Sequence, residues 1–499
     1  MRAALATSVL LFVFALLLQS QVGPASTSTP PISERLSIVS ESASKTDAYP
    51  EIEELCDLIG PRLTGSVGEA KAEQLMLGRM RDIGLSRVHA ESWELPRSWH
   101  RGPATASLVT PFSLPIPVAA YGWTGSTQNL NGPSPVFLLH ADDIAEHLDA
   151  LVHSQGASWN GKILLVSASS SKPMRAYAGL FALVQAATGA HAIAVLRHDT
   201  RPGVGLVHSE PLSVVLPDRV DSTLIPALDI PSESEQLIEH LLSSGRTATM
   251  SISVVNDFSS GPVTSNNIVG EIEGATHPEQ VVLVGAHLDS WDLGTGATDD
   301  GFGVAAVLGA AKALVRSRVR PTRTIRFVLF SGEEQGLLGS TAYVHSHANE
   351  LHSMVAALVL DWGAGPIVKL PVAGHPELLP LLQQLNTLSP ALGLQSPSDG
   401  YLFMTDAYAF TLAGVPGIAP LVQSARYYEE AHSIEDTLDK VNPADLQQSM
   451  TVLTVASFLL ADSPSTPITR FTPEQTRSAL IQGKQNRMLE PFGLWPFKE

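Results

Sequence analysis

Residues 280–317 read "QVVLVGAHLDSWDLGTGATDDGFGVAAVLGAAKALVRS". The first ten residues are an apolar run of strand length that ends on His287 and Asp289. A glycine-rich loop with Asp299 and Asp300 follows, and the apolar residues after it continue for the length of a helix. A buried strand followed by a helix is the repeating unit of α/β proteins. The fold therefore depends on whether this unit recurs.

The same alternation recurs three times along the chain. Apolar runs of strand length are followed by longer helical patterns within residues 324–351, 354–388 and 414–462. Continuous apolar strands that alternate with helices indicate a mostly parallel sheet with helices on both faces. We therefore expect an α/β fold whose functional site lies at the carboxyl ends of the strands.

Residues 102–262 have a different sequence pattern, in which short β-rich runs alternate with clusters of glycine, proline and serine. This pattern predicts a smaller β-rich domain inserted into the first one. Helical spacing closed by glycine predicts a helix over residues 66–85. The chain is expected to divide into a signal peptide (1–22), a linker or propeptide (23–44), the first part of the main domain (45–101), the inserted domain (102–262), the main part of the main domain (263–462) and a C-terminal tail (463–499).

The N-terminus has the form of a secretory signal peptide, with one arginine followed by an apolar run over residues 3–18. This run is shorter than the roughly 20 residues that a membrane-spanning helix needs, which disfavours the alternative of an anchor. We expect a secreted or periplasmic protein with no stable membrane span after signal cleavage. The only cysteine, Cys56, cannot form a disulfide within the chain and is expected to be a buried apolar residue.

The net charge limits the classes of partner. The chain has 31 basic and 49 acidic residues and a formal net charge of -18. Such a charge argues against nucleic acid or an anionic membrane surface as the main partner.

Three predicted strands end on acidic or histidine side chains. His287 and Asp289 end the first, Glu333 and Glu334 follow the second, and Asp361 ends the third. The strand ends share one edge of a parallel sheet, and so many carboxylates can be buried together only if cations neutralise them. Imidazole and carboxylate ligands without sulfur suit Zn²⁺ or a similar divalent ion.

The spacing of these residues adds detail. Asp289 lies two residues after His287 on a strand, faces the same side and can orient the imidazole. Asp299 and Asp300 precede a helix, where a carboxylate can bridge two metals and is stabilised by the helix N-terminus. Asp300 either supports the site or caps the helix. His432, in "YYEEAHSIEDTLDK", adds a further candidate ligand.

Five motifs in order, "HLDS", "GATDDGFG", "SGEEQGLLGS", "DWG" and "HSIEDTLDKV", resemble those of the M28 family of co-catalytic zinc metallopeptidases, and within it the carboxypeptidase Q group. Residues 55–85 are similar to the segment that precedes the catalytic core in this family. The stretches "GKILLVS" and "GAHAIAVLRH" resemble the protease-associated (PA) domain that many members carry as an insertion. The resemblance covers most of residues 45–462 and implies an aminopeptidase or dipeptidase acting on peptides or dipeptides.

The resemblance also implies roles for single residues, with two Zn²⁺ per chain and Asp299 as the bridge between them. Glu333 would be the general base, although the residues alone indicate only that one of the two adjacent glutamates stays free of metal. One ion would be held by His287, Asp299 and Asp361, and the other by Asp299, Glu334 and His432.

Two positions depart from the family pattern. Ala431 precedes the last ligand, where some relatives have an aromatic residue or histidine that stabilises an oxyanion. That role is unassigned here, with Tyr427 and Tyr428 as neighbours only. Residues 405–407 read Thr-Asp-Ala where the family has Ser-Asp-His, which puts substrate contacts at that segment in doubt.

Other polar and aromatic residues have simpler interpretations. His345, His347 and His352 are expected to form a solvated helix face rather than a third metal site. Trp291 and Trp362 flank the candidate ligands and serve either as pocket walls or as hydrophobic filler.

Two other functions compete with a peptidase. One is a catalytically silent ectodomain that keeps the fold for binding, and the other is a single-zinc acyltransferase related to glutaminyl cyclases. The full set of ligands and a base favours the peptidase over both. Whether the inserted domain acts as a lid, shapes specificity or forms a homodimer stays open.

Overall fold

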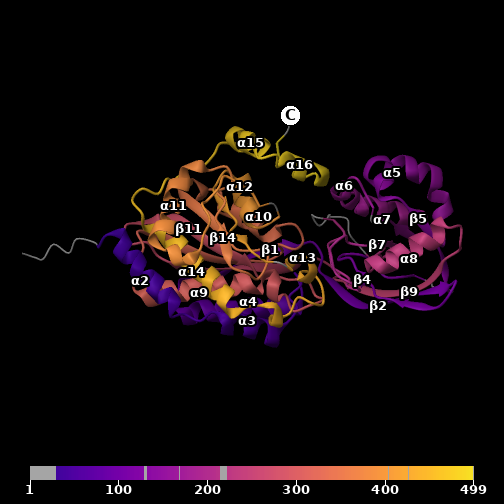
Figure 1. Cartoon of the computed structure of the whole chain (residues 1–499), viewed down its shortest axis with the longest axis horizontal. Helices are drawn as coiled ribbons and strands as arrows, with labels where there is room; N and C mark the ends of the chain where they lie inside the picture. The colour runs from indigo at the N-terminus through magenta and orange to yellow at the C-terminus, as the bar shows by residue number, and fades with distance from the viewer. Residues whose placement is uncertain are drawn as a thin grey trace, which may run out of the picture.

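The computed structural model describes residues 30–128, 132–167, 169–213, 222–402, 404–424 and 426–497. Two large sheets lie side by side, and each carries its own helices (Figure 1). The predicted signal peptide at residues 1–22 lies outside the described residues. Within the described ranges, no helix has both the length and the apolar character needed to cross a membrane.

The first sheet has six strands in the order β1-β10-β12-β11-β13-β15. Strands β12, β11, β13 and β15 are parallel, whereas β10 pairs antiparallel with both β12 and β1. The predicted α/β fold is thus confirmed, and the antiparallel pairs lie at the edge where the chain leaves for the second sheet and returns from it. The strands are β1 (Ser86–Leu95), β10 (Val263–Ile272), β11 (His277–His287), β12 (Arg323–Phe330), β13 (Met354–Val359) and β15 (Gly417–Ile418).

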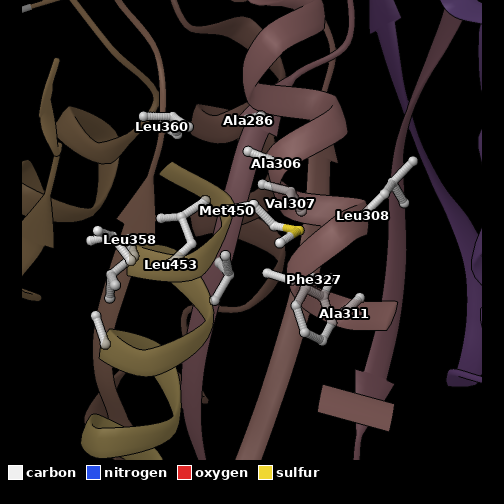
Figure 2. Close-up of a cluster of buried hydrophobic side chains, with 14 of the residues drawn as sticks. Ala286, Ala306, Val307, Leu308, Ala311, Phe327, Leu358, Leu360, Met450 and Leu453 are labelled. Carbon is white, nitrogen blue, oxygen red and sulfur yellow. The ribbon is translucent and has the colours of Figure 1, made fainter. Parts of the chain in front are cut away.

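Helices cover both faces of this sheet, as the continuous apolar strands predict. Val282 and Val284 of β11 belong to the core beneath one set of helices, whereas Leu283 belongs to the core on the opposite face. Figure 2 shows the first core, in which Met450 lies among side chains of the sheet and of the neighbouring helix. The helices of the first face are α2 (Ile32–Ser44), α3 (Tyr49–Glu54), α4 (Val67–Ile83), α9 (Phe302–Ser317), α11 (Leu379–Leu388) and α14 (Pro443–Asp462), and those of the second are α10 (Leu338–Ser346) and α12 (Ala407–Leu412).

Helix α4 matches the helix predicted over residues 66–85. Ser66 caps its start by accepting a hydrogen bond from the Glu69 backbone N–H, and Gly84 ends it in a left-handed conformation with φ 94°. Buried Cys56 lies nearby in the same core, where burial raises the pKa of its thiol to about 11.

Helix α2 occupies most of the segment that the sequence predicts to be a linker or propeptide. Leu36, Val39 and Ala43 are buried at helical spacing, and Arg35 forms an ion pair with Asp462 at the end of α14. The amphipathic spacing within a serine-rich segment explains why α2 is part of the core rather than a linker.

The second sheet has eight strands in the order β3-β2-β9-β5-β6-β7-β8-β4 and its own hydrophobic core. Its central strands, β5 to β8, are parallel, and helices connect β5 to β6 and β6 to β7. This unit therefore contains more helix than the β-rich sequence pattern predicts. The strands are β2 (Trp99–Thr110), β3 (Leu114–Ile116), β4 (Ala119–Ala120), β5 (Ser134–Leu139), β6 (Ile163–Val166), β7 (Ala194–Arg197), β8 (Ala227–Asp229) and β9 (Thr249–Phe258). The helices are α5 (Ala141–Gln155), α6 (Pro173–Ala178), α7 (Leu180–Gly189) and α8 (Ser232–Ser243).

The remaining elements connect or cover these two units. Strands β14 (Ile367–Lys369) and β16 (Leu421–Val422) pair with each other, and α13 (Tyr427–Glu430) follows them. The C-terminal tail, to which the sequence assigns no structure, forms α15 (Pro473–Gln482), α16 (Asn486–Leu489) and the 3₁₀ turn η9 (Glu490–Phe492).

Candidate metal centre

The candidate ligands meet at the carboxyl ends of three adjacent parallel strands. His287 is the last residue of β11, Glu333 and Glu334 follow β12, and Asp361 follows β13. The structure brings all five predicted ligands into two groups that share Asp299, and the donor atoms within each group lie within 4.8 Å of one another.

The first group contains His287, Asp299 and Asp361. His287 Nε2 lies 3.0 Å from Asp299 Oδ1 and 3.8 Å from Asp361 Oδ1. All three residues are at most 5% exposed. A histidine nitrogen and two carboxylate oxygens thus face one point at the end of the sheet.

The second group contains Asp299, Glu334 and His432. His432 Nε2 lies 3.1 Å from Asp299 Oδ2 and 3.1 Å from Glu334 Oε2. The two oxygens of Asp299 therefore face different groups, as a bridging carboxylate requires. Glu334 Oε1 is buried and has no hydrogen-bond partner among the described residues, so it is free to accept a cation.

Asp289 supports the site in a different way from the one predicted. His287 Nδ1 donates to the backbone carbonyl of Asp289 at 3.0 Å, whereas the Asp289 carboxylate lies 3.7 Å away. That carboxylate instead accepts hydrogen bonds from the Thr64 hydroxyl and from the backbone N–H groups of Glu333 and Glu334. The carbonyl fixes the tautomer that leaves Nε2 free for a metal, and the carboxylate holds the adjacent glutamates in place.

Asp300 combines the two roles left open by the sequence. Its Oδ1 accepts the Gly303 backbone N–H at 2.9 Å near the start of α9, and its Oδ2 accepts the His287 backbone N–H at 3.2 Å. Asp300 thus ties the helix start to the end of β11.

Burial and charge determine the electrostatics of the site. Burial raises the pKa of Glu333 well above its usual range, and the charges of Asp361 and Glu334 raise it further. Burial also opposes ionisation of Asp299, but hydrogen bonds from His287 and His432 hold the Asp299 pKa well below its usual value. Asp299 is therefore the carboxyl group of this cluster that the surroundings most favour in its ionised form.

The segment that follows β7 in the second unit contacts the second group directly, which sequence reasoning missed. His432 Nδ1 lies 3.0 Å from the Ser209 carbonyl and 3.1 Å from Glu210 Oε1. Arg201 pairs with Glu210 and also donates to the Ala431 carbonyl at 3.2 Å. Burial opposes the ionisation of Glu210, but the charges of Arg201 and His432 lower the pKa of Glu210 to about 2. A fixed anion thus faces the ring nitrogen opposite the candidate metal side.

Tyr427 is more than a neighbour of the ligands. Its hydroxyl donates to Asp299 Oδ2 at 2.8 Å, and its ring stacks on Trp362 with centroids 6.3 Å apart. Trp362 lines the cavity described below, whereas Trp291 is buried against Trp123 of the second sheet and lies 5.9 Å from the His432 ring. One tryptophan is thus a pocket wall, and the other fills the space behind a candidate ligand.

Residues 405–407, whose sequence departs from the family pattern, lie beneath the candidate site. Asp406 is 1% exposed, and burial raises its pKa to about 7. Ala407 begins helix α12 and belongs to the core on that face of the sheet.

The histidine cluster at and beyond the end of α10 differs in part from the predicted solvated helix face, because only His345 lies within α10. His345 and His352 are exposed, but the His347 ring stacks on Tyr343 and lies between Glu91 and Glu350 at 3.0 and 3.2 Å. His347 is an ion-paired histidine because β1 places Glu91 beside α10. Among the described residues, this cluster forms no group with metal-ligand geometry.

A cavity of about 650 Å³ opens over the candidate ligands. Asp299, Glu333, Glu334, Asp361 and His432 line its floor. Its volume falls in the range of small-molecule and substrate sites. A pocket in which several carboxylates and an imidazole converge is the default candidate for an active site.

Known protein families and sequences include relatives of this chain. Residues 267–456 match the model of Peptidase family M28. Carboxypeptidase Q of Xenopus laevis is 29% identical over 429 residues, which cover 83% of this chain and 86% of that protein.

Solved structures show the same fold. A Peptidase M28 precursor from Shewanella amazonensis SB2B is 27% identical with a TM-score of 0.77, covering 89% of this chain and 99% of the other. BSAP, a zinc aminopeptidase from Bacillus subtilis, is 23% identical with a TM-score of 0.62, covering 85% and 97% of the two chains. The second likeness is one of fold.

Proposed function

We propose, from the premise that this chain belongs to peptidase family M28 and is a metallo-exopeptidase, that it cleaves the peptide bond next to a free N-terminus at a site with two zinc ions. The observation that carries the proposal is the pair of donor groups that share Asp299 at the strand ends. One ion would be held by His287, Asp299 and Asp361, and the other by Asp299, Glu334 and His432.

The residues present fit two divalent ions. Each group offers one imidazole nitrogen and two carboxylates, which is a donor set that suits zinc and contains no sulfur. The unpartnered Glu334 Oε1 and the raised pKa of Asp361, caused mainly by burial, both indicate carboxylates that lack a balancing cation. When bound, zinc supplies a water of lowered pKa and polarises the scissile carbonyl.

Glu333 is proposed to move the proton. It lines the cavity floor beside the ligands, and its backbone N–H is held by Asp289. A carboxylate with a raised pKa can take a proton from the attacking water and then deliver it to the leaving amine. Asp289 positions Glu333 and Glu334, while Tyr427 fixes one oxygen of Asp299.

The alternatives receive less support from the site. A catalytically inactive binding protein would not require a buried carboxylate base beside two groups of candidate ligands. A single-zinc acyltransferase would require only one of these groups. The complete arrangement therefore favours peptide hydrolysis.

Substitution of Glu333 tests the proposed base. Glu333→Gln is expected to keep both metals and to lower kcat on aminoacyl or dipeptide substrates by about 10²-fold or more, because the amide cannot accept the proton. Glu279→Gln is the matched control, since Glu279 is an exposed glutamate at the start of β11. Metal content by mass spectrometry and steady-state kinetics give the two readouts. Unchanged turnover in Glu333→Gln would contradict the assignment.

The location and domain division are also proposals. The apolar N-terminal run, which lies outside the described residues, supports export with cleavage near residue 22. The separate core of the second sheet supports an inserted domain of the PA type within residues 102–262. N-terminal sequencing of the exported protein tests the first proposal.

A further inference from the structure

The C-terminal tail crosses from the six-stranded unit to the second sheet. In Figure 1, helix α15 lies above the six-stranded unit, and α16 extends from there toward the second unit and lies close to α6. The tail begins with a capping box, in which the Thr472 hydroxyl and the Gln475 side chain each bond to the backbone of the other residue. This segment therefore has a defined start and path.

A small hydrophobic cluster fixes the tail to the six-stranded unit. Leu480 and Leu489 are at most 1% exposed and pack with Tyr408 of α12. Leu494 and Trp495, which follow the last turn, are partly buried against the same cluster. The turn η9 lies between these anchored residues, so its position is determined on both sides.

The tip of the tail contacts the second sheet through Phe492. The Phe492 and Tyr177 rings meet edge to face with centroids 6.1 Å apart. Tyr177 of α6 is itself fixed, because its hydroxyl donates to the Pro211 carbonyl at 2.8 Å and Arg197 lies over its ring. The tail thus joins the two units through an aromatic contact.

The same tip forms a wall of the cavity above the candidate ligands. Met488 and Phe492 line this cavity together with Tyr177 and Trp362. The cavity of about 650 Å³ is thus bounded by the six-stranded unit, the second sheet and the tail. An extended peptide lengthens by about 3.3–3.6 Å per residue, so a ten-residue chain of about 33–36 Å cannot be enclosed there.

We infer that the segment formed by Met488 and Phe492 limits the substrates of this site to short peptides of a few residues. The inference rests on the proposed function, because it names the substrate class of the same site. In this proposal, the apolar wall occupies the space into which a longer peptide would extend from the floor of candidate ligands. The tail is therefore a determinant of specificity and takes no part in the chemistry.

Paired substrates test the inference. The two peptides are Leu-Leu and a ten-residue peptide that begins with Leu-Leu, and kcat/KM is measured for both with the zinc-loaded enzyme. The wild-type enzyme is expected to prefer the dipeptide. In Met488→Ala/Phe492→Ala, kcat/KM for the long peptide should rise about tenfold or more, with a change of less than about threefold for the dipeptide.

Controls separate this effect from loss of structure. Arg487→Ala changes an exposed residue of the same helix and should leave the ratio of the two kcat/KM values unchanged. A second variant that ends at Gly483 removes the whole wall and should show the same gain for the long peptide, with folding checked by circular dichroism.

Two results would overturn the inference. Equal use of both peptides by the wild-type enzyme would leave the proposed function intact but remove the size limit. An unchanged ratio in the folded double variant would do the same. Failure to cleave either peptide by any form would instead refute the proposed function, together with the inference that rests on it.

Discussion

His432 links the two units of the molecule through its two ring nitrogens. Nε2 faces Asp299 and Glu334 at 3.1 Å each, and Nδ1 faces Ser209 and Glu210 in the segment after β7 of the second unit. A carboxylate on the far ring nitrogen orients a metal-binding histidine and raises its basicity. The second sheet thus holds a candidate ligand in place.

Glu210→Ala is expected to weaken zinc binding by about 10- to 100-fold, because it removes the carboxylate partner of His432 and leaves Asp199 as the remaining carboxylate paired with Arg201 among the described residues. Glu239→Ala, on helix α8 of the same unit, is the control. The dissociation constant is measured by competition with a chelator of known affinity. Equal affinities in both variants would show that the Ser209 carbonyl alone suffices.

Among the secondary-structure elements, the strands and the residues at their ends were the features that the sequence predicted best. The side chains at the ends of β11, β12 and β13 could be predicted because parallel strands bring their carboxyl ends to one edge. Helix α2 escaped prediction because its apolar positions lie in a serine-rich segment. The contact of Glu210 with His432 was not predicted, because no local sequence pattern indicates which loop of a separate unit will reach His432.

The packing of α14 on α9 and the sheet gives a prediction at this scale. Met450 is fully buried between these elements (Figure 2). Met450→Ala should lower the free energy of unfolding by about 2–5 kcal/mol, because the cavity left behind loses its packing contacts. Thr451→Ala, half-exposed on the same helix, should change it by less than about 0.5 kcal/mol. Urea unfolding followed by near-UV circular dichroism measures both, and equal effects would contradict the packing.

For the whole molecule, the site depends on three segments that are far apart in the sequence. The six-stranded unit supplies the candidate ligands, the segment after β7 in the second unit supplies Glu210 and Arg201, and the tail supplies Met488 and Phe492. Composition and texture predict two units but not the surfaces on which they meet. The tail shows the same limit, since its few apolar residues acquire a role only once α12 and α6 lie beside them.

The central claim is that two ions share Asp299 at the ends of the strands. Anomalous diffraction from crystals of the zinc-loaded protein, measured at the zinc absorption edge, tests this claim most directly. We predict two peaks per chain, one among His287, Asp299 and Asp361 and the other among Asp299, Glu334 and His432. A single peak, or two peaks that do not both contact Asp299, would contradict the account.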